Sequence, residues 1–208
     1  MKAPTREITR IVPDATALKA LTHPVRLRML GMLRIDGPAT ATGLAERLGL
    51  NSGATSYHLR QLAQHGFIEE AADQPSRRDR WWQARHESTS FFEPGGTEEQ
   101  FDTSVAFAQA ALTEQVNLMQ RAQDEFTRLP PEWRATTQIS DFTIALTTAQ
   151  ANALKDKLLE LLWQAMREAP GLGADLPPGV EPYTVMLHAF PYPGRLTGGE
   201  GRDKRGDK

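Results

Sequence analysis

Apolar residues in the first third of the chain recur every three to four positions, which is the spacing of amphipathic helices. Residues that start and stop helices divide this stretch into segments. Pro24 suits the first position of one helix, Thr40 and Asn51 suit the N-caps of two others, and Gly49 suits a C-terminal stop. The predicted helices cover residues 15–21, 24–36, 41–48 and 51–64.

A change from helical to alternating spacing follows the fourth helix. Two short alternating runs separated by polar residues predict a β-hairpin, and a hairpin after three packed helices is typical of a winged helix-turn-helix. Arg77 and Arg78 lie at its tip. Trp81 and Trp82 point to opposite faces, so we expect one in the core and the other exposed or covered by a dimer partner. The predicted strands are residues 67–70 and 80–84, and the turn is residues 73–79.

The helix over residues 51–64 has a small, hydrogen-bonding face opposite an apolar one. Thr55, Leu59 and Leu62 share the face directed toward a core. The outward face can bind phosphates and base edges. A solvated helix face, and a hairpin whose arginines pair with Asp73 and Asp79, are the alternatives. The candidate DNA contacts are Thr40, Asn51, Ser52, Gly53, Ser56, Tyr57, Arg60, Arg77, Arg78 and Arg80.

A second long helix is predicted over residues 97–129. Thr97 and Gln100 form a capping box, and from Phe101 onward the apolar positions alternate by four and three residues. This seam either joins two copies of the chain, with Gln115 setting the register, or packs on the chain's own C-terminal part. We expect dimerisation, because a two-fold DNA site requires a two-fold protein. The candidate dimer contacts are Phe101, Val105, Ala108, Leu112, Gln115 and Met119.

The C-terminal part, residues 136–191, is predicted to form a strand-helix-strand unit. Residues 139–146 and 182–190 alternate like strands, and Thr147 with Gln150 caps a helix between them. The helical crossover would make the two strands parallel, with other strands or a partner subunit completing the sheet. Residues 1–14 are expected to be a flexible arm and residues 194–208 a disordered tail.

Composition and charge agree with two modules rather than one compact globule. The chain has 208 residues, of which 39% are hydrophobic, and it has no cysteine, which excludes disulfides and thiolate metal sites. Its net charge of −2 is unevenly distributed: residues 15–90 hold ten Lys and Arg against seven Asp and Glu, whereas the rest holds 14 against 19. The fold class is therefore mainly α with a small β component, with a DNA-facing winged helix-turn-helix over residues 15–90.

Four segments of this region resemble the successive signatures of the arsenic-repressor (ArsR-type) winged helix-turn-helix family. The resemblance covers residues 15–87 and implies homodimeric bacterial transcription regulators that bind DNA. Metal-sensing members of that family often use cysteine thiolates, which this chain does not contain. The segments are Leu-Thr-His-Pro-Val-Arg-Leu-Arg-Met-Leu (21–30), Gly-Leu-Ala-Glu-Arg-Leu-Gly-Leu (43–50), Ser-Tyr-His-Leu-Arg-Gln-Leu (56–62) and His-Gly-Phe-Ile-Glu-Glu (65–70).

The sequence shows no catalytic or cofactor-binding constellation. It has no Gly-rich phosphate loop, no Gly-x-Ser-x-Gly elbow and no His-Glu-x-x-His motif, so we expect neither an enzyme nor a cofactor. His58 could serve as a ligand or a pH switch, but we interpret it as a packing residue that hydrogen-bonds locally. The other four histidines are dispersed, and no metal site is expected.

These patterns together predict a homodimeric, sequence-specific transcription regulator, a repressor by family habit. Its partners would be double-stranded DNA, a second copy of itself and an unidentified small-molecule effector, and we expect it in the cytoplasm without membrane contact. The strand-helix-strand unit could sense the effector or clamp the dimer. The alternative function is a protein-interaction adaptor whose winged helix binds no DNA.

Overall fold

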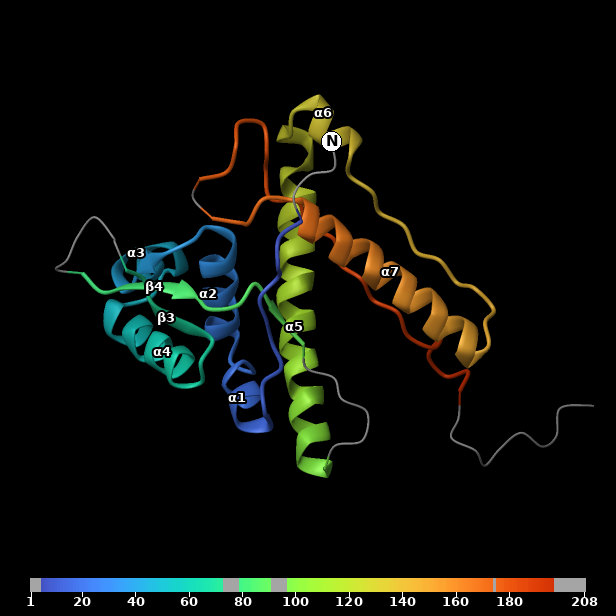
Figure 1. Cartoon of the computed structure of the whole chain (residues 1–208), viewed down its shortest axis with the longest axis horizontal. Coiled ribbons are helices and arrows are strands. Elements are labelled where there is room, and N and C mark those ends of the chain that lie inside the picture. The colour runs from blue at the N-terminus through green and yellow to red at the C-terminus, as the bar shows by residue number, and fades with distance from the viewer. Residues whose placement is uncertain (1–4, 73–78, 91–96, 174, 197–208) are drawn as a thin grey trace, which may run out of the picture.

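The computed structural model describes residues 5–72, 79–90, 97–173 and 175–196. Figure 1 shows a winged-helix module at one end, the long helix α5 (Glu98–Glu125) across the middle, and helix α7 (Thr148–Glu168) projecting from the other side of α5. The molecule is mainly helical, with two small sheets. The predicted fold class is confirmed in this respect.

The four short helices of the winged-helix module begin where the sequence predicts. Each is preceded by a side chain that accepts a hydrogen bond from a backbone N–H of the first turn, which satisfies one of the otherwise unpaired donors there. Gly49, at φ 65°, ends the third helix in the left-handed conformation that glycine tolerates best. The helices are α1 (Ala15–Ala20), α2 (Pro24–Ile35), α3 (Ala41–Leu48) and α4 (Ser52–Gln64), with caps Asp14, His23, Thr40 and Asn51.

A three-stranded antiparallel sheet, in the order β2-β4-β3, completes the module. The register places Ile68 opposite Ala84. Trp82 is buried and Trp81 is half-buried, so Trp82 is the tryptophan that reaches the core. The strands are β2 (Ala39–Thr40), β3 (Ile68–Glu70) and β4 (Trp81–Ala84).

One hydrophobic core holds the module together. It lies between the helices and the sheet, and Phe107 of α5 is buried in it with Ala111 packed against it. Helix α5 packs on α1 and α2, and Arg28 of α2 forms an ion pair with Glu114 of α5, with N···O at 3.6 Å. The fully buried large side chains of this core are Leu21, Met29, Leu30, Leu44, Thr55, Leu59, Leu62, Phe67 and Ile68.

Helix α5 extends far beyond the module that it packs against. Its predicted capping box is present, because the Thr97 hydroxyl accepts from Gln100 N and the Gln100 carboxamide accepts from Thr97 N. A 3-10 turn, η1 (Phe126–Arg128), ends it before two prolines, and the short α6 (Pro131–Ala135) follows. The long predicted helix is therefore present, with its last turn tightened.

The predicted strand-helix-strand unit is only partly correct. Helix α7 and its capping box of Thr147 and Gln150 are present, but residues 139–146 and 182–190 form no strands. Both run extended beside α7 (Figure 1) without a ladder of backbone hydrogen bonds. Alternating side chains make a segment suitable for a strand, but a strand exists only when a neighbour shares its hydrogen bonds.

The N-terminal segment is also different from the prediction. Residues 5–14 are not a free arm: β1 (Arg10–Ile11) pairs in parallel with β5 (Ser88–Thr89), and Arg6 N donates to Arg167 O at 3.0 Å. The partners lie about eighty residues or more away in sequence, so local periodicity could not reveal them. Residues 1–4 and 197–208, which include most of the expected tail, lie outside the described residues.

Candidate nucleic-acid interface

Helix α4 packs on the core through one face and leaves the other face to solvent. Thr55, Leu59 and Leu62 are fully buried, as predicted. The Thr55 hydroxyl donates to the carbonyl oxygen of Asn51 at 3.1 Å, so this polar side chain is satisfied inside the core. Rotating the helix about its axis would expose these residues and bury polar ones. The packing therefore determines which side chains face outward.

The outward face of α4 carries most of the candidate contacts. Tyr57 is 52% exposed, and Ser56 is half-buried beside it. The helix has no acidic residue, and Arg60 forms no ion pair with any described residue. Such a surface offers hydroxyl groups and an unpaired guanidinium to a polyanion. The exposed candidates on or next to α4 are Asn51, Ser52, Gly53, Tyr57 and Arg60.

The first turn of α4 is built for a close approach to its backbone. Asn51 Oδ1 accepts from Ala54 N at 2.8 Å. A Cβ atom at Gly53 would lie 3.3 Å from that same Oδ1, tighter than most contacts of a Cβ atom. Gly53 therefore keeps the cap uncrowded and leaves the helix N-terminus open. Backbone N–H groups at a helix N-terminus favour phosphate oxygens.

Thr40 has a structural role in addition to its predicted contact. Its hydroxyl oxygen accepts from Gly43 N at 3.1 Å and caps α3, and its backbone lies opposite Trp81 in the sheet. It is half-buried. The hydroxyl hydrogen is not used by the cap, so the side chain can still donate to an acceptor outside the protein.

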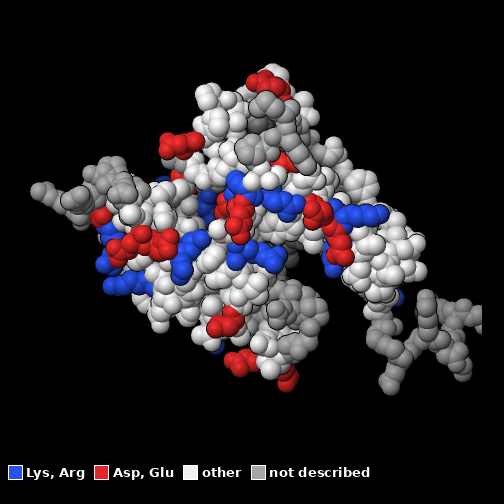
Figure 2. Space-filling view, viewed as in Figure 1, with Lys and Arg blue, Asp and Glu red and all other residues white. Residues whose placement is uncertain are grey.

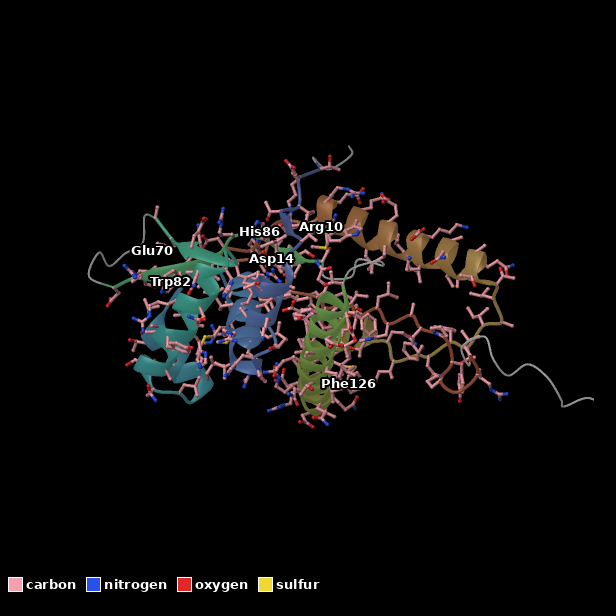
Figure 3. All side chains as sticks on the ribbon, turned by 90° about the horizontal axis from the view of Figure 1, so that it is seen from below. Arg10, Asp14, Glu70, Trp82, His86 and Phe126 are labelled. Carbon is pink, nitrogen blue, oxygen red and sulfur yellow. The ribbon has the colours of Figure 1, made fainter. Side chains whose placement is uncertain are left out.

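The wing is described only at its base. Arg80 Nε lies 3.0 Å from Glu70 Oε1, and the Arg80 guanidinium lies 5.6 Å from the centre of the Trp82 ring. Figure 3 shows Glu70 and Trp82 close together at the outer end of the sheet. An exposed ion pair of this kind contributes at most about 1 kcal/mol, so a phosphate could displace it. Arg77 and Arg78 lie outside the described residues.

Charges on the winged-helix module are mixed rather than gathered in one basic patch. Figure 2 shows Lys and Arg side chains over this end of the molecule with a group of acidic side chains among them. Two ion pairs account for part of this pattern: Arg80 with Glu70, and Arg85 with Glu69, whose N···O distance is 3.3 Å. The surplus of three positive charges in residues 15–90 is thus partly spread among local pairs, whereas the one arginine of α4 has no ion-pair partner among the described residues.

Two histidines meet behind the outward face of α4. The rings of His23 and His58 are 4.5 Å apart between centroids, and Tyr57 lies edge-on to His58. Burial, with a smaller effect of the nearby Arg26 guanidinium, lowers the pKa of both imidazoles. His58 Nδ1 is buried without a hydrogen-bond partner among the described atoms, so the local bond that we predicted for His58 is absent at this nitrogen.

Arg34 is a residue that the sequence analysis missed. It lies on α2 in a helical position that looks like a solvated charge, yet its Nε donates to His86 O at 2.8 Å and its Nη2 to Thr89 Oγ1 at 2.8 Å. Burial lowers its pKa to about 10. These bonds hold the segment after the wing, including β5, against α2. No local signal marks such a role, because both partners lie more than 50 residues away.

The candidate dimer contacts on α5 lie on the side turned away from the winged-helix module. Phe101 and Leu112 are 59% and 49% exposed, and Ala108 is exposed as well. Gln115 is half-buried. The apolar seam is therefore uncovered in the single chain. Its exposed large side chains are Phe101, Val105, Leu112, Val116 and Met119.

Among the described residues, no three His, Asp or Glu side chains come close enough together to hold a metal ion. No described helix has the length and hydropathy that crossing a membrane requires.

Residues 21–71 match a protein family described as a helix-turn-helix domain. This range runs from the end of α1 to the residue after β3 and contains all of α4. The structure and the match agree. In sequence and in fold, residues 21–71 are similar to a helix-turn-helix domain.

Two curated relatives match stretches of similar length. The HTH-type transcriptional regulator YgaV of Escherichia coli is 42% identical over 60 residues, which are 28% of this chain and 60% of that protein. The HTH-type transcriptional regulator NmtR of Mycobacterium tuberculosis is 43% identical over 54 residues, 26% of this chain and 44% of that protein. The chain thus spans about half the length of these relatives. Both are regulators rather than enzymes.

Solved structures give a weaker likeness over a longer stretch. NMB1585, a MarR family regulator from Neisseria meningitidis, has 21% sequence identity and a TM-score of 0.29, with 69% of this chain and 78% of that chain covered. The transcriptional regulator Tm0710 from Thermotoga maritima has 13% identity and a TM-score of 0.29, with 67% and 73% covered. Scores this low carry no argument about function.

Proposed function

We propose that this protein is a homodimeric, sequence-specific DNA-binding transcription regulator of the ArsR type, acting as a repressor in the cytoplasm. The observation that carries the proposal is the outward face of α4, which is free of acidic side chains and ends a helix-turn-helix whose inward face is fully packed. The names of the curated relatives support the same function. The four ArsR-type signatures lie within residues 21–71, the range that matches the helix-turn-helix family.

In the proposed complex, α4 lies in the major groove and the wing lies beside the adjoining minor groove. Arg60 contacts a guanine or a phosphate, while Ser56 and Tyr57 donate to phosphates or bases. A two-fold axis places two such helices about 34 Å apart, one turn of DNA. Asn51, Ser52 and Gly53 bring the helix N-terminus to the phosphate backbone.

Regulation would act through the spacing of the two reading helices. A ligand that binds more tightly to a dimer with mismatched spacing lowers the affinity of the dimer for DNA. Bound DNA lowers the affinity for that ligand by the same factor. The contacts of the N-terminal segment support a route for this: β1 pairs with β5 behind the wing, and Arg6 Nε donates to Ala169 O, at the end of α7, at 2.9 Å. A conformational change at α7 would thus be transmitted to β1 and β5, next to the wing.

The proposal is tested by the salt dependence of DNA binding. Binding of the full chain to duplexes selected from a random pool is measured by fluorescence anisotropy over a range of salt concentrations. The triple variant Arg60→Ala, Arg77→Ala, Arg78→Ala should lose affinity and reduce the salt slope by up to about three, if each arginine neutralises one phosphate.

The matched control is Arg121→Ala, an exposed arginine on α5 that should leave the slope unchanged. Unchanged binding in the triple variant would contradict the groove-and-wing arrangement. Failure of the unaltered chain to enrich any duplex would instead favour an adaptor that binds protein partners through its winged helix.

A further inference from the structure

The C-terminal half of the chain has helices but no core. From residue 108 to residue 196, no described residue is buried, although α7 alone has 21 residues. Ordering a residue costs about 1–2 kcal/mol of backbone entropy, which only buried surface can offset. A segment this long cannot be ordered by capping boxes alone. Some surface that is absent from the single chain must cover it.

The uncovered surface is concentrated on the two extended segments beside α7. Phe142 is 83% exposed, Phe190 71% and Tyr183 57%. Aromatic side chains each offer about 150–250 Å², so these three expose roughly 300–500 Å². Five aliphatic side chains add to this area: Ile139, Ile144, Leu146, Val185 and Leu187. The total approaches the roughly 800 Å² that each partner of a stable complex buries.

The backbone of the same segments is also unpaired. Residues 140–146 and 181–191 make no backbone-to-backbone hydrogen bond with any described residue. The Tyr183 hydroxyl donates to Thr136 O at 2.8 Å, which joins the second segment to the chain just before the first. Two neighbouring extended segments with free N–H and C=O groups are a template for strand pairing.

The charges of these segments favour a second copy of the same chain. Proteins normally protect an exposed edge strand with lysines or other charges. Residues 139–146 contain one charged side chain, Asp141, and residues 182–192 contain no Asp, Glu, Lys or Arg. Like segments can therefore approach without repulsion. A two-fold axis also pairs equivalent strands antiparallel, which buries the same apolar face of each copy.

We propose that a second copy of this chain covers the C-terminal part, so that residues 139–146 and 182–190 of both copies form one intersubunit β-sheet with the two α7 helices packed on it. This inference rests on the homodimer of the proposed function and adds, to the α5 seam, a second surface that joins its subunits. The strands predicted from sequence then exist only in the dimer. Each copy supplies half of the sheet.

A spin-label experiment tests this arrangement directly. The chain contains no cysteine, so Thr143→Cys creates a single labelling site, and any dipolar coupling must come from a second copy. Neighbouring strands lie about 4.8 Å apart, so two labels in a four-stranded sheet should lie within about 25 Å, flexible arms included. The full-length protein is measured at concentrations where sedimentation shows a dimer.

A second set of variants links the distance to the apolar surface. Phe142→Asp combined with Val185→Asp should abolish the short distance and raise the dimer dissociation constant at least tenfold. Leu172→Asp is the matched control, because Leu172 is an exposed leucine outside both segments. This variant should change neither the label distance nor the dimer dissociation constant.

The outcomes separate this inference from the proposed function. A dimer whose labels lie more than about 40 Å apart, well beyond a shared sheet, overturns the inference and leaves a DNA-binding homodimer in place. A protein that stays monomeric at every concentration overturns both the inference and the homodimer. A short distance that survives the double variant also overturns it, because the apolar faces would then not form the contact.

Discussion

At the scale of single residues, Arg34 shows how one charged side chain can hold together segments that lie far apart in the sequence. Arg34→Met removes the donors for His86 O and Thr89 Oγ1 and leaves the His86 carbonyl oxygen without this hydrogen bond. We expect a loss of about 1–3 kcal/mol in the free energy of unfolding, measured with urea. Arg47→Met is the control, since its exposed pair with Asp36 should cost less than about 1 kcal/mol. Equal losses of unfolding free energy in the two variants would contradict the structural role given to Arg34.

The histidine pair makes a prediction about pH. Burial lowers the pKa of His23 and His58 below 6.5 in the folded protein. As the pH falls below about 6.5, the unfolded chain binds protons first, so stability is full above that value and is lost as the pH falls through the lowered pKa. His58→Asn should flatten the pH dependence of urea unfolding between about pH 7 and 5. Gln64→Asn, at an exposed position of the same helix, should not.

At the scale of elements, the helices were the easiest part to predict. The caps at Thr40, Asn51, Thr97 and Thr147 are chemical signals that lie next to the helices they start, and all four are present. The paired strands of the wing were also predictable, because a hairpin joins neighbours in sequence. Strands β1 and β5 were not, since their pairing joins residues far apart in the chain.

The apolar seam of α5 makes a prediction at the same scale. Leu112→Glu places a charge at the centre of the proposed dimer contact, where it would be buried without a partner. We expect a shift toward monomers, seen in sedimentation as a dimer dissociation constant raised more than tenfold. Asn117→Glu adds the same charge at an exposed, polar position of α5 and is the control. A dimer unaffected by Leu112→Glu would place the interface elsewhere.

At the scale of the whole molecule, no described residue after Phe107 is buried, and α5 links the compact winged-helix module to a C-terminal part without a core. Hydrogen exchange should therefore be slowest in α2, α3 and α4 at every protein concentration. Exchange in α7 should be fast in dilute protein and slow down as the protein dimerises. Protection of α7 equal to that of α2 in monomeric protein would contradict this picture.

The sequence by itself determined the helices, the wing and the outward face of α4, because caps, periodicity and a short hairpin are local properties. It also indicated where strands would be stable if they had partners. The tertiary structure decided which residues meet across long distances: Arg34 with the segment after the wing, β1 with β5, and Arg6 with the end of α7. It also decided that the C-terminal strands stay unpaired in one chain, because strand pairing is a contact between segments rather than a property of either.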